Sequence, residues 1–272
     1  MPTYRHGRHE HGQNFLTDLA TIATIVRLID DTAGPIIEIG PGDGALTAPL
    51  TRLGRPLTAV EIDARRAASL RRRCAGVRVE RADFLRYRLP ATPHVLVGNV
   101  PFSQTTAILR RILHAHGWTD AVLLVQWEVA RRRAGVGGAS MMTAQWWPWF
   151  TFEQAGRVPA DAFTPRPGVD GGLLVIRRDP APAIPVAQRG AYQGLVHRVF
   201  TGRGRGLAQI LARTAFGSAP AARAWLSARG VGAHDLPKAL TRQDWIDLYA
   251  ARPRAATSRR HRSDVHRDKP MY

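Results

Sequence analysis

Residues 36–44 read Ile36-Ile37-Glu38-Ile39-Gly40-Pro41-Gly42-Asp43-Gly44, an apolar run that passes directly into a turn of alternating glycines. The run has the length of a buried strand, and a helical pattern follows it at residues 45–53. Glycines at this junction permit a tight turn and let the backbone approach a ligand closely. The stretch therefore predicts a strand, a ligand-binding turn and a helix, the opening unit of a nucleotide-binding α/β sheet.

The same alternation continues along the chain. Predicted strands lie at residues 36–39, 57–60, 77–79, 95–97 and 122–125, each before a polar, amphipathic segment. This repetition predicts an α/β fold with a Rossmann-like, mostly parallel sheet covered by helices. Two later apolar runs, 150–152 and 173–176, are separated by Pro- and Gly-rich residues without a helical pattern, so we expect them to pair antiparallel at one edge.

Composition changes after residue 178. Pro180, Pro182 and Pro185 are typical of a linker, and helical patterns follow at residues 187–200, 205–216, 220–229 and 241–251. We therefore expect a basic N-terminal arm at 1–12, a ligand-binding domain at 13–178 and a small helical domain at 179–251. Residues 252–272 hold seven Lys or Arg and almost no large apolar side chains, which predicts a basic, disordered tail.

Positive charge dominates the composition. Lys and Arg number 39 against 21 Asp and Glu, a formal net charge of +18, and only Lys238 and Lys269 are lysines. A chain this basic is expected to bind a polyanion such as a nucleic acid. Arginine suits bidentate phosphate contacts, although a GC-rich coding bias would also favour arginine over lysine, so the net charge is the stronger indication.

Other features exclude several classes. Cys74 is the only cysteine, which excludes an internal disulfide and a thiolate metal cluster and is typical of a reducing compartment. No apolar run reaches the roughly 18 residues of a membrane span, and the N-terminus is unlike a signal peptide, so we expect a cytoplasmic protein. The Trp-rich residues 146–150 are expected in the core or at a partner face. His6, His9 and His11 lack a further ligand, so no metal site is predicted.

Carboxylates follow the next two predicted strands. Glu61 ends the second strand, 21 residues after Gly40, where a carboxylate can accept hydrogen bonds from both hydroxyls of a ribose. Asp83 follows the third strand and can accept from an adenine amine. A dinucleotide turn places its third glycine one position later than this chain does, so NAD is disfavoured. Together with Gly40 and Gly42, these carboxylates predict a site for S-adenosylmethionine.

A polar and aromatic tetrapeptide ends the fourth predicted strand. Asn99-Val100-Pro101-Phe102 follows the apolar residues 94–98, at the edge where open α/β sheets bind ligands. The Asn carbonyl and an exposed ring suit a planar amine, whereas the tetrapeptide taken alone favours a simple turn. Its position after the strands that carry Gly40, Glu61 and Asp83 favours the binding site.

Six motifs, in this order, resemble those of the ribosomal RNA adenine N6-methyltransferases. They are Gln13-Asn14-Phe15-Leu16, the turn at 40–44, Glu61-Ile62-Asp63, Asp83-Phe84-Leu85, Asn99-Val100-Pro101-Phe102 and Phe163-Thr164-Pro165-Arg166-Pro167, and the resemblance spans residues 8–178. Within this group the chain is most similar to the macrolide-resistance (Erm) methyltransferases of large-subunit ribosomal RNA, on Asn-Val-Pro-Phe, Val169-Asp170-Gly171-Gly172 and residues 200–206. The sister branch that dimethylates small-subunit RNA more often has Leu-Pro-Tyr after the Asn.

The resemblance implies a class I methyltransferase sheet and a specific activity. That activity is S-adenosylmethionine-dependent N6-methylation, single or double, of an adenine in large-subunit (23S) ribosomal RNA, with resistance to macrolide-type antibiotics. The resemblance also implies a set of residues around the methyl donor, namely Asn14, Leu16, Gly40, Glu61, Asp83 and Asn99.

An adenine amine is a poor nucleophile because its lone pair is delocalised into the ring. We expect the Asn99 side-chain carbonyl and the Pro101 main-chain carbonyl each to accept one N6 hydrogen, which directs the lone pair at the methyl group. Phe102 and Phe163 are expected to stack on a base that has left its helix. For Phe163, packing against the edge strands is an equal alternative.

The sequence also indicates where RNA would bind, and it leaves three alternative functions to consider. We expect the protein to be a monomer and the tail to contact RNA phosphates. Surface arginines are expected to contact phosphates as well, and they are Arg131, Arg132, Arg133, Arg203 and Arg205. For each arginine the alternative is a solvated basic face without a ligand. The nearest alternative function is a small-subunit (16S) ribosomal RNA adenine dimethyltransferase. A non-catalytic nucleic-acid-binding factor is disfavoured by intact Glu61, Asp83 and Asn99, and an NAD-dependent oxidoreductase by the glycine spacing and the basicity.

Overall fold

The structure, a computed structural model, describes residues 14–252. The predicted N-terminal arm, the three histidines in it, Gln13 and the predicted tail beyond Arg252 lie outside the described residues. The strands are β1 (Phe15–Leu16), β2 (Ile36–Ile39), β3 (Leu57–Glu61), β4 (Arg78–Arg81), β5 (His94–Asn99), β6 (Trp118–Gln126), β7 (Phe150–Val158), β8 (Phe163–Thr164) and β9 (Gly171–Arg178). The α-helices are α1 (Leu19–Asp30), α2 (Thr47–Thr51), α3 (Ala64–Arg73), α4 (Thr105–His114), α5 (Trp127–Arg133), α6 (Met141–Trp146), α7 (Arg189–Thr201), α8 (Leu207–Leu211), α9 (Ala219–Ser227) and α10 (Arg242–Ala251).

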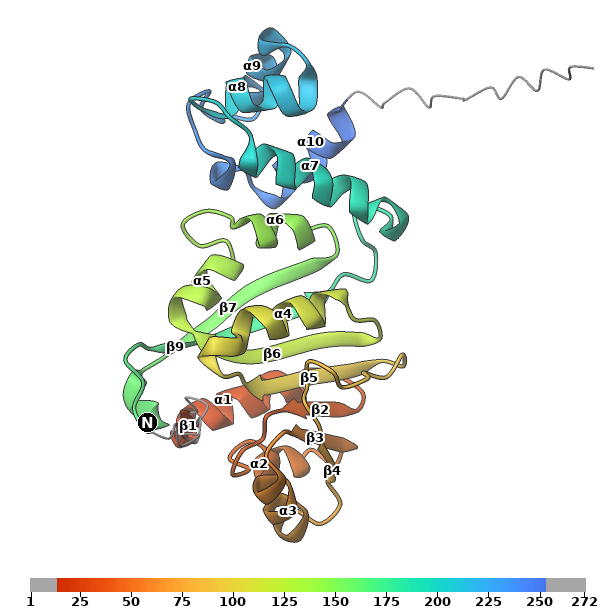
Figure 1. Ribbon diagram of the computed structural model, residues 1–272, viewed down its shortest axis with the longest axis vertical. Coiled ribbons are helices and arrows are strands. Elements are labelled where there is room, and N and C mark those ends of the chain that lie inside the picture. The colour runs from red at the N-terminus through yellow and green to blue at the C-terminus, as the bar shows by residue number, and fades with distance from the viewer. Residues whose placement is uncertain (1–13, 253–272) are drawn as a thin grey trace, which may run out of the picture.

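One central sheet organises these elements, in the strand order β4-β3-β2-β5-β6-β9-β7 (Figure 1). The strands from β4 to β6 run parallel, whereas β9 pairs antiparallel with both β6 and β7. The predicted Rossmann-like, mostly parallel sheet with antiparallel pairing at one edge is therefore confirmed. A second ribbon joins β1 to β8 and brings residues 15–16 beside residues 163–164.

Strict alternation along the central strands builds a core on each face of the sheet. In β5, Val95 and Val97 pack with α1 and α2 on one face, while Leu96 packs with α4 on the other. Such alternation is what a strand buried on both faces requires, because successive side chains point to opposite faces. Because both faces of the sheet are apolar and covered, we expect a ligand to bind at the strand ends and at the loops that follow them.

The helices α7 to α10 form a layer at one end of the molecule, beyond α6 and opposite α3 (Figure 1). The predicted boundary at residue 179 falls directly after β9, and the division into domains stays a prediction. Aromatic side chains join this layer to the sheet: the Trp149 and Tyr192 rings lie 5.5 Å apart, and the Tyr192 hydroxyl donates to the Ala144 carbonyl at 2.7 Å. Trp146 and Trp149 are buried, which confirms the core position expected for the Trp-rich segment.

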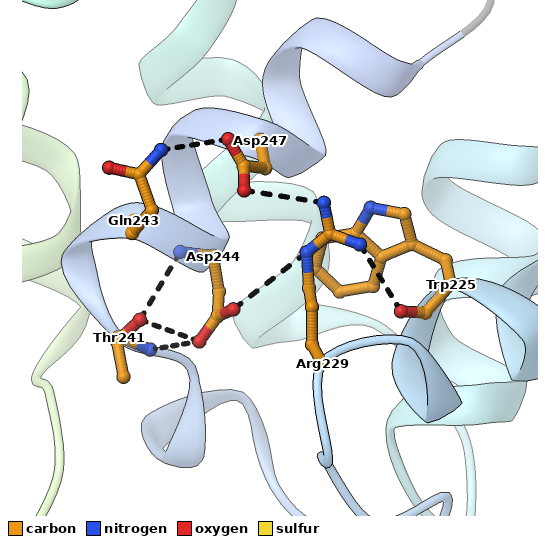
Figure 2. A network of polar contacts seen from close by, with 6 residues as sticks. All are labelled: Trp225, Arg229, Thr241, Gln243, Asp244 and Asp247. Atoms are coloured by element: carbon orange, nitrogen blue, oxygen red, sulfur yellow. Dashed lines mark hydrogen bonds and ion pairs between the residues drawn. The ribbon is translucent and has the colours of Figure 1, made fainter.

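An arginine after α9 connects that helix to α10 (Figure 2). The Arg229 guanidinium lies 4.1 Å from the centroid of the Trp225 ring and pairs with Asp247 at 3.3 Å and Asp244 at 3.8 Å. Asp244 also accepts from the Thr241 backbone N–H at 2.8 Å, and the Thr241 hydroxyl caps the first turn of α10 in return. This network therefore fixes the start of α10 against α9.

Three of the expected exclusions concern the described residues. None of the helices between residues 14 and 252 combines the length and apolar character that crossing a bilayer requires. The same residues contain no cluster of three His, Cys, Asp or Glu side chains able to hold a metal ion. Cys74 is a partly buried free thiol at the end of α3.

Candidate functional site

The glycine turn after β2 has the backbone geometry that its sequence predicts. Gly40, Gly42 and Gly44 have φ values of 62°, 56° and 87°, a region that other residues rarely adopt. A Cβ on Gly42 would lie 3.0 Å from the Phe15 ring, so this glycine lets β1 approach the turn, whereas a Cβ on Gly40 would meet only open space. The Gly40 backbone therefore faces a cavity.

That cavity has a volume of about 310 Å³ and is bordered by three segments far apart in the chain: 14–17, 38–46 and 99–102. A cavity of this size lies at the lower end of the range for small-molecule sites, roughly 300–1,000 Å³. The predicted site residues that border it are Asn14, Leu16, Gly40, Gly42, Asn99, Pro101 and Phe102. The fold therefore places the glycine turn, predicted to bind the methyl donor, beside the tetrapeptide 99–102, which is predicted to bind an amine.

Asn99 ends β5 with its side chain held in one orientation. Its Nδ2 donates to the Asn14 main-chain carbonyl at 2.7 Å. Because a carbonyl only accepts hydrogen bonds, the amide nitrogen must face Asn14, which leaves Oδ1 as the acceptor on the other side. The contact spans 85 positions in the chain, so β1 determines which atom of Asn99 is free to bind a ligand.

The two main-chain carbonyls that follow Asn99 differ from the prediction in which of them is free to accept a hydrogen bond. The Pro101 carbonyl accepts from the Gln104 backbone N–H at 2.9 Å and from the Thr105 hydroxyl at 3.3 Å, because a 3₁₀ turn and α4 begin there. Both of its lone pairs are therefore engaged, and the structure does not support Pro101 as the acceptor for an amine. Val100 borders the same cavity, and its carbonyl receives no hydrogen bond from any residue within 14–252.

Glu61, at the end of β3, lies behind the glycine turn rather than on the cavity wall. Its side chain is 2% exposed, and its two oxygens accept from the Gly42 N–H at 2.9 Å and the Asp63 N–H at 2.8 Å. Each oxygen keeps a second lone pair for a further donor. The carboxylate therefore ties the glycine turn to the loop that starts α3.

Asp83 lies next to Glu61 along the sheet edge but outside the cavity. The Ala82 N–H donates to the Glu61 carbonyl at 3.0 Å, and one Asp83 oxygen accepts from the Leu85 N–H at 2.9 Å. Asp83 borders a separate open depression together with Arg86 and Tyr87. Gly42, Glu61 and Asp83 therefore follow one another along the edge of the sheet, and Asp83 lies outside the cavity.

Glu38 is a site residue that the sequence reasoning missed. It borders the cavity from within β2, is 1% exposed, and accepts from the Thr47 hydroxyl at 2.6 Å. Burial raises the pKa of the Glu38 carboxyl to about 7; the hydrogen bond from Thr47 opposes the rise, and the charge of Glu61 adds to it. The sequence does contain an indication of this residue, namely a carboxylate within an apolar strand. Charged residues are seldom buried without a role.

Phe102 and Phe163 form an aromatic pair beside the cavity. Their ring centroids lie 6.3 Å apart with the planes at 73°, an edge-to-face arrangement. Phe163 is only 2% exposed because β8 pairs with β1 over it, whereas Phe102 is partly exposed. A base cannot stack on the buried Phe163 ring, so the structure does not support the stacking predicted for Phe163. The Phe163 ring packs against Phe102 instead.

The predicted RNA-contacting arginines fall into two groups. Arg132, Arg203 and Arg205 are exposed. Arg131 is partly exposed and pairs with Glu128 at 3.5 Å. Arg133 is directed into the protein, where it donates to the Ser140 hydroxyl at 2.8 Å and where burial lowers its pKa, so a phosphate contact from Arg133 is not supported.

Known proteins resemble this chain over nearly its full length. The family model for ribosomal RNA adenine dimethylase matches residues 5–251. An rRNA adenine N-6-methyltransferase from Corynebacterium diphtheriae is 63% identical over 215 residues, which cover 78% of this chain and 85% of that protein. The mycinamicin-resistance protein MyrB from Micromonospora griseorubida is 48% identical over 245 residues, 89% of this chain and 78% of MyrB.

The fold comparison agrees. The crystal structure of the 23S rRNA methyltransferase ErmE superposes with a TM-score of 0.81 at 33% sequence identity, covering 87% of this chain and 98% of that one. The match therefore includes the helical layer as well as the sheet. On the family match, the 63% identical relative and this shared architecture, the chain is a methyltransferase and belongs to the ribosomal RNA adenine dimethylase family.

Proposed function

We propose that this protein transfers methyl groups from S-adenosylmethionine to N6 of an adenine in large-subunit (23S) ribosomal RNA and thereby confers resistance to macrolide-type antibiotics. The names of MyrB and of ErmE support the large-subunit target and the resistance. The observation that carries the proposal is the fixed orientation of Asn99, whose Oδ1 is left as an acceptor at the cavity.

The residues present fit the methyl donor. Gly40 leaves open space over the turn for the amino-acid end, and Glu61, with a spare lone pair on each oxygen, would accept from the ribose hydroxyls. Asp83 would receive the adenine amine at the open end of the site. Asn14 and Leu16 would close the cavity from the β1 side. When bound, the donor supplies a methyl group made electrophilic by its positively charged sulfur.

Two acceptors are available for the two N6 hydrogens of the target adenine. In the proposal these are Asn99 Oδ1 and the Val100 carbonyl, which replaces Pro101 in that role. Accepting both hydrogens draws the nitrogen toward a pyramidal geometry and directs its lone pair at the methyl group, an effect that grows toward the transition state. No strong base is needed, because the amine proton becomes acidic once the methyl group has transferred.

The ring of the target adenine would stack on Phe102. The Phe102 ring contacts that of Phe163 in an edge-to-face arrangement, with the centroids 6.3 Å apart. Stacking on an aromatic ring is worth about 1–3 kcal/mol per base in single-strand binders, enough to offset part of the cost of unstacking the adenine.

The rest of the RNA would be bound through phosphates. Arg132, Arg203 and Arg205 are exposed on the sheet side and on the helical layer, so residues 179–251 are included in the proposed RNA-binding surface. We further propose that the protein acts as a monomer in the cytoplasm, where ribosomal RNA is assembled.

The deciding experiment measures methyl transfer to defined RNAs. The purified full chain would be incubated with labelled S-adenosylmethionine and with protein-free 23S or 16S ribosomal RNA, and the modified base would be located by primer extension. We expect a single modified adenine in 23S RNA, and a raised macrolide tolerance when the gene is expressed in a sensitive host. Label confined to 16S RNA would establish the small-subunit alternative and overturn the proposal.

A further inference from the structure

A second depression opens at the same edge of the sheet, one strand away from Asn99. It has a volume of about 660 Å³ and is bordered by Trp127, Glu128, Arg157, Arg166, Val169 and Asp170, which we call the Trp127 pocket. Trp127 directly follows β6, the strand that lies beside β5. None of the roles proposed above uses this pocket.

Contacts with β9 and the loop before it hold Trp127 in place. The Trp127 backbone N–H donates to the Asp170 carbonyl at 2.9 Å. Gly172 on β9 gives the ring room, since a Cβ there would lie 3.1 Å from Trp127 Cε3 and 2.8 Å from the Ala130 methyl. The indole is therefore a preformed aromatic surface that stays partly exposed.

Arginines surround this ring. The Arg157 guanidinium lies 5.5 Å and that of Arg131 6.0 Å from the indole centroid. Asp170 holds Arg157 with two contacts, at 2.5 and 2.7 Å. Arg166 is exposed and, within residues 14–252, has no carboxylate at ion-pair distance. An aromatic ring with arginines close to it is the combination that binds an unpaired nucleotide, through stacking and phosphate contacts.

The pocket is separate from the cavity at Asn99, and the two are connected through neighbouring residues. Asn99 pairs in register with Leu124, three residues before Trp127, and the Val100 N–H donates to the Leu124 carbonyl at 3.0 Å. On the other side, Phe163 contacts Phe102, and the chain runs from Phe163 into Arg166 and Asp170. The Trp127 pocket is therefore close enough to Asn99 to receive a nucleotide next to the target adenine.

We infer that the Trp127 pocket is a second nucleotide subsite, which receives the base adjacent to the target adenine on the Trp127 indole and its phosphate on Arg157 and Arg166. The inference rests on the proposed function. Flipping the adenine out removes the stacking partner of its neighbour, so a second aromatic surface stabilises the opened strand. Such a subsite would also make the enzyme prefer an RNA whose neighbouring nucleotide is unpaired.

The test compares three RNA hairpins that all carry the target adenine. One is intact, one has an abasic residue on the 5′ side of the adenine, and one has an abasic residue on its 3′ side. For the wild-type protein we expect the KM for RNA to rise about tenfold on loss of one of the two bases, as stacking energies predict. The variant Trp127→Leu should have the raised KM with all three hairpins, and the KM for S-adenosylmethionine should not change.

Arg157→Gln tests the phosphate contact and remains informative if Trp127→Leu fails to fold. It should reduce the dependence of RNA affinity on salt by about one phosphate contact. Arg177→Gln is the matched control: Arg177 lies at the opposite end of the β7–β9 pair, is 47% exposed against 62% for Arg157, and pairs with Glu153 at 2.7 Å. Its salt dependence should equal that of the wild type.

Two results would overturn the subsite. One is an equal response of the wild type and Trp127→Leu to removal of either neighbouring base, and the other is an unchanged salt dependence in Arg157→Gln. Both are distinct from failure of the proposed function, in which the wild-type protein would methylate none of the hairpins.

Discussion

In the proposed reaction, the Asn99 side chain would bind its own protein and the substrate at the same time. The amide nitrogen is engaged by Asn14, so the oxygen is presented to the cavity without a search among rotamers. Preorganised acceptors of this kind add more to the rate than to ground-state binding, because the protein is already arranged for the charge that develops.

Replacing Asn99 with Ala should reduce the rate of methyl transfer by at least about 100-fold, on the scale of removing one preorganised hydrogen-bonding group. The affinity for S-adenosylmethionine should fall much less, because the glycine turn and Glu61 are untouched. Single-turnover methylation and titration of the methyl donor measure the two effects separately. The control is Thr24→Ala, on the exposed face of α1; near-normal turnover in Asn99→Ala would contradict the assigned role.

Glu38 links the site to the stability of the fold. Burial raises the pKa of its carboxyl from 4.5 to about 7, so between these pH values the native state holds a proton that the unfolded state has lost. The stabilisation from this proton is fully present below pH 4.5 and is lost as the pH rises through 7.

The variant Glu38→Gln removes this titration while its amide oxygen can still accept from Thr47. Between about pH 5 and about pH 8, the free energy of unfolding of the wild type should fall by up to about 3 kcal/mol relative to the variant, at roughly 1.4 kcal/mol per pKa unit. Urea denaturation of both proteins at the two pH values measures the difference. Parallel pH profiles would show that Glu38 is already ionised in the native protein.

At the scale of elements, short contacts at strand and helix ends decide how the site is assembled. The ribbon of β1 and β8 buries Phe163 and places Asn14 against Asn99, although it contains two residues from each segment. In the helical layer, Arg229 and the capping residues of α10 have the corresponding role (Figure 2).

Arg229→Met should destabilise the protein by about 1–3 kcal/mol, because it leaves Asp244 and Asp247 without their partner while keeping the packing of the side-chain stem. The Arg229 side chain is 24% exposed, so solvent screens part of the loss. Thermal unfolding of Arg213→Met, whose guanidinium reaches only an exposed backbone carbonyl at 2.9 Å, provides the comparison. If the two variants unfold together, the network contributes no stability.

On the scale of the whole molecule, charge governs the encounter with RNA. A net charge of +18 predicts strong, salt-dependent binding of polyanions, and the exposed arginines lie on both the sheet domain and the helical layer. This charge includes the seven Lys and Arg of residues 252–272, a segment that lies almost wholly outside the described residues.

Deleting residues 252–272 should weaken RNA binding and lower the slope of log affinity against log salt by about 1–3, as loss of a few phosphate contacts requires. Filter binding over a range of salt concentrations measures the slope. A full-length chain in which the seven cations are replaced with Gln separates charge from length and should behave like the deletion. An unchanged slope in both would show that the tail does not contact RNA.

The sequence by itself did not predict the short strands β1 and β8, but it determined the order of the five parallel strands, the antiparallel edge, the helical layer and the glycine turn. These depend on side-chain alternation, glycine backbone freedom and motif spacing, all of which are local properties of the chain. Only the tertiary structure decided that the Pro101 carbonyl is engaged, that Phe163 is buried, that Arg133 points inward and that Glu38 borders the cavity. The physical reason is that hydrogen-bond availability and burial are set by whatever packs against a group. For Asn99 and Phe163 that partner is the β1 segment, which lies far away in the chain and adjacent in space.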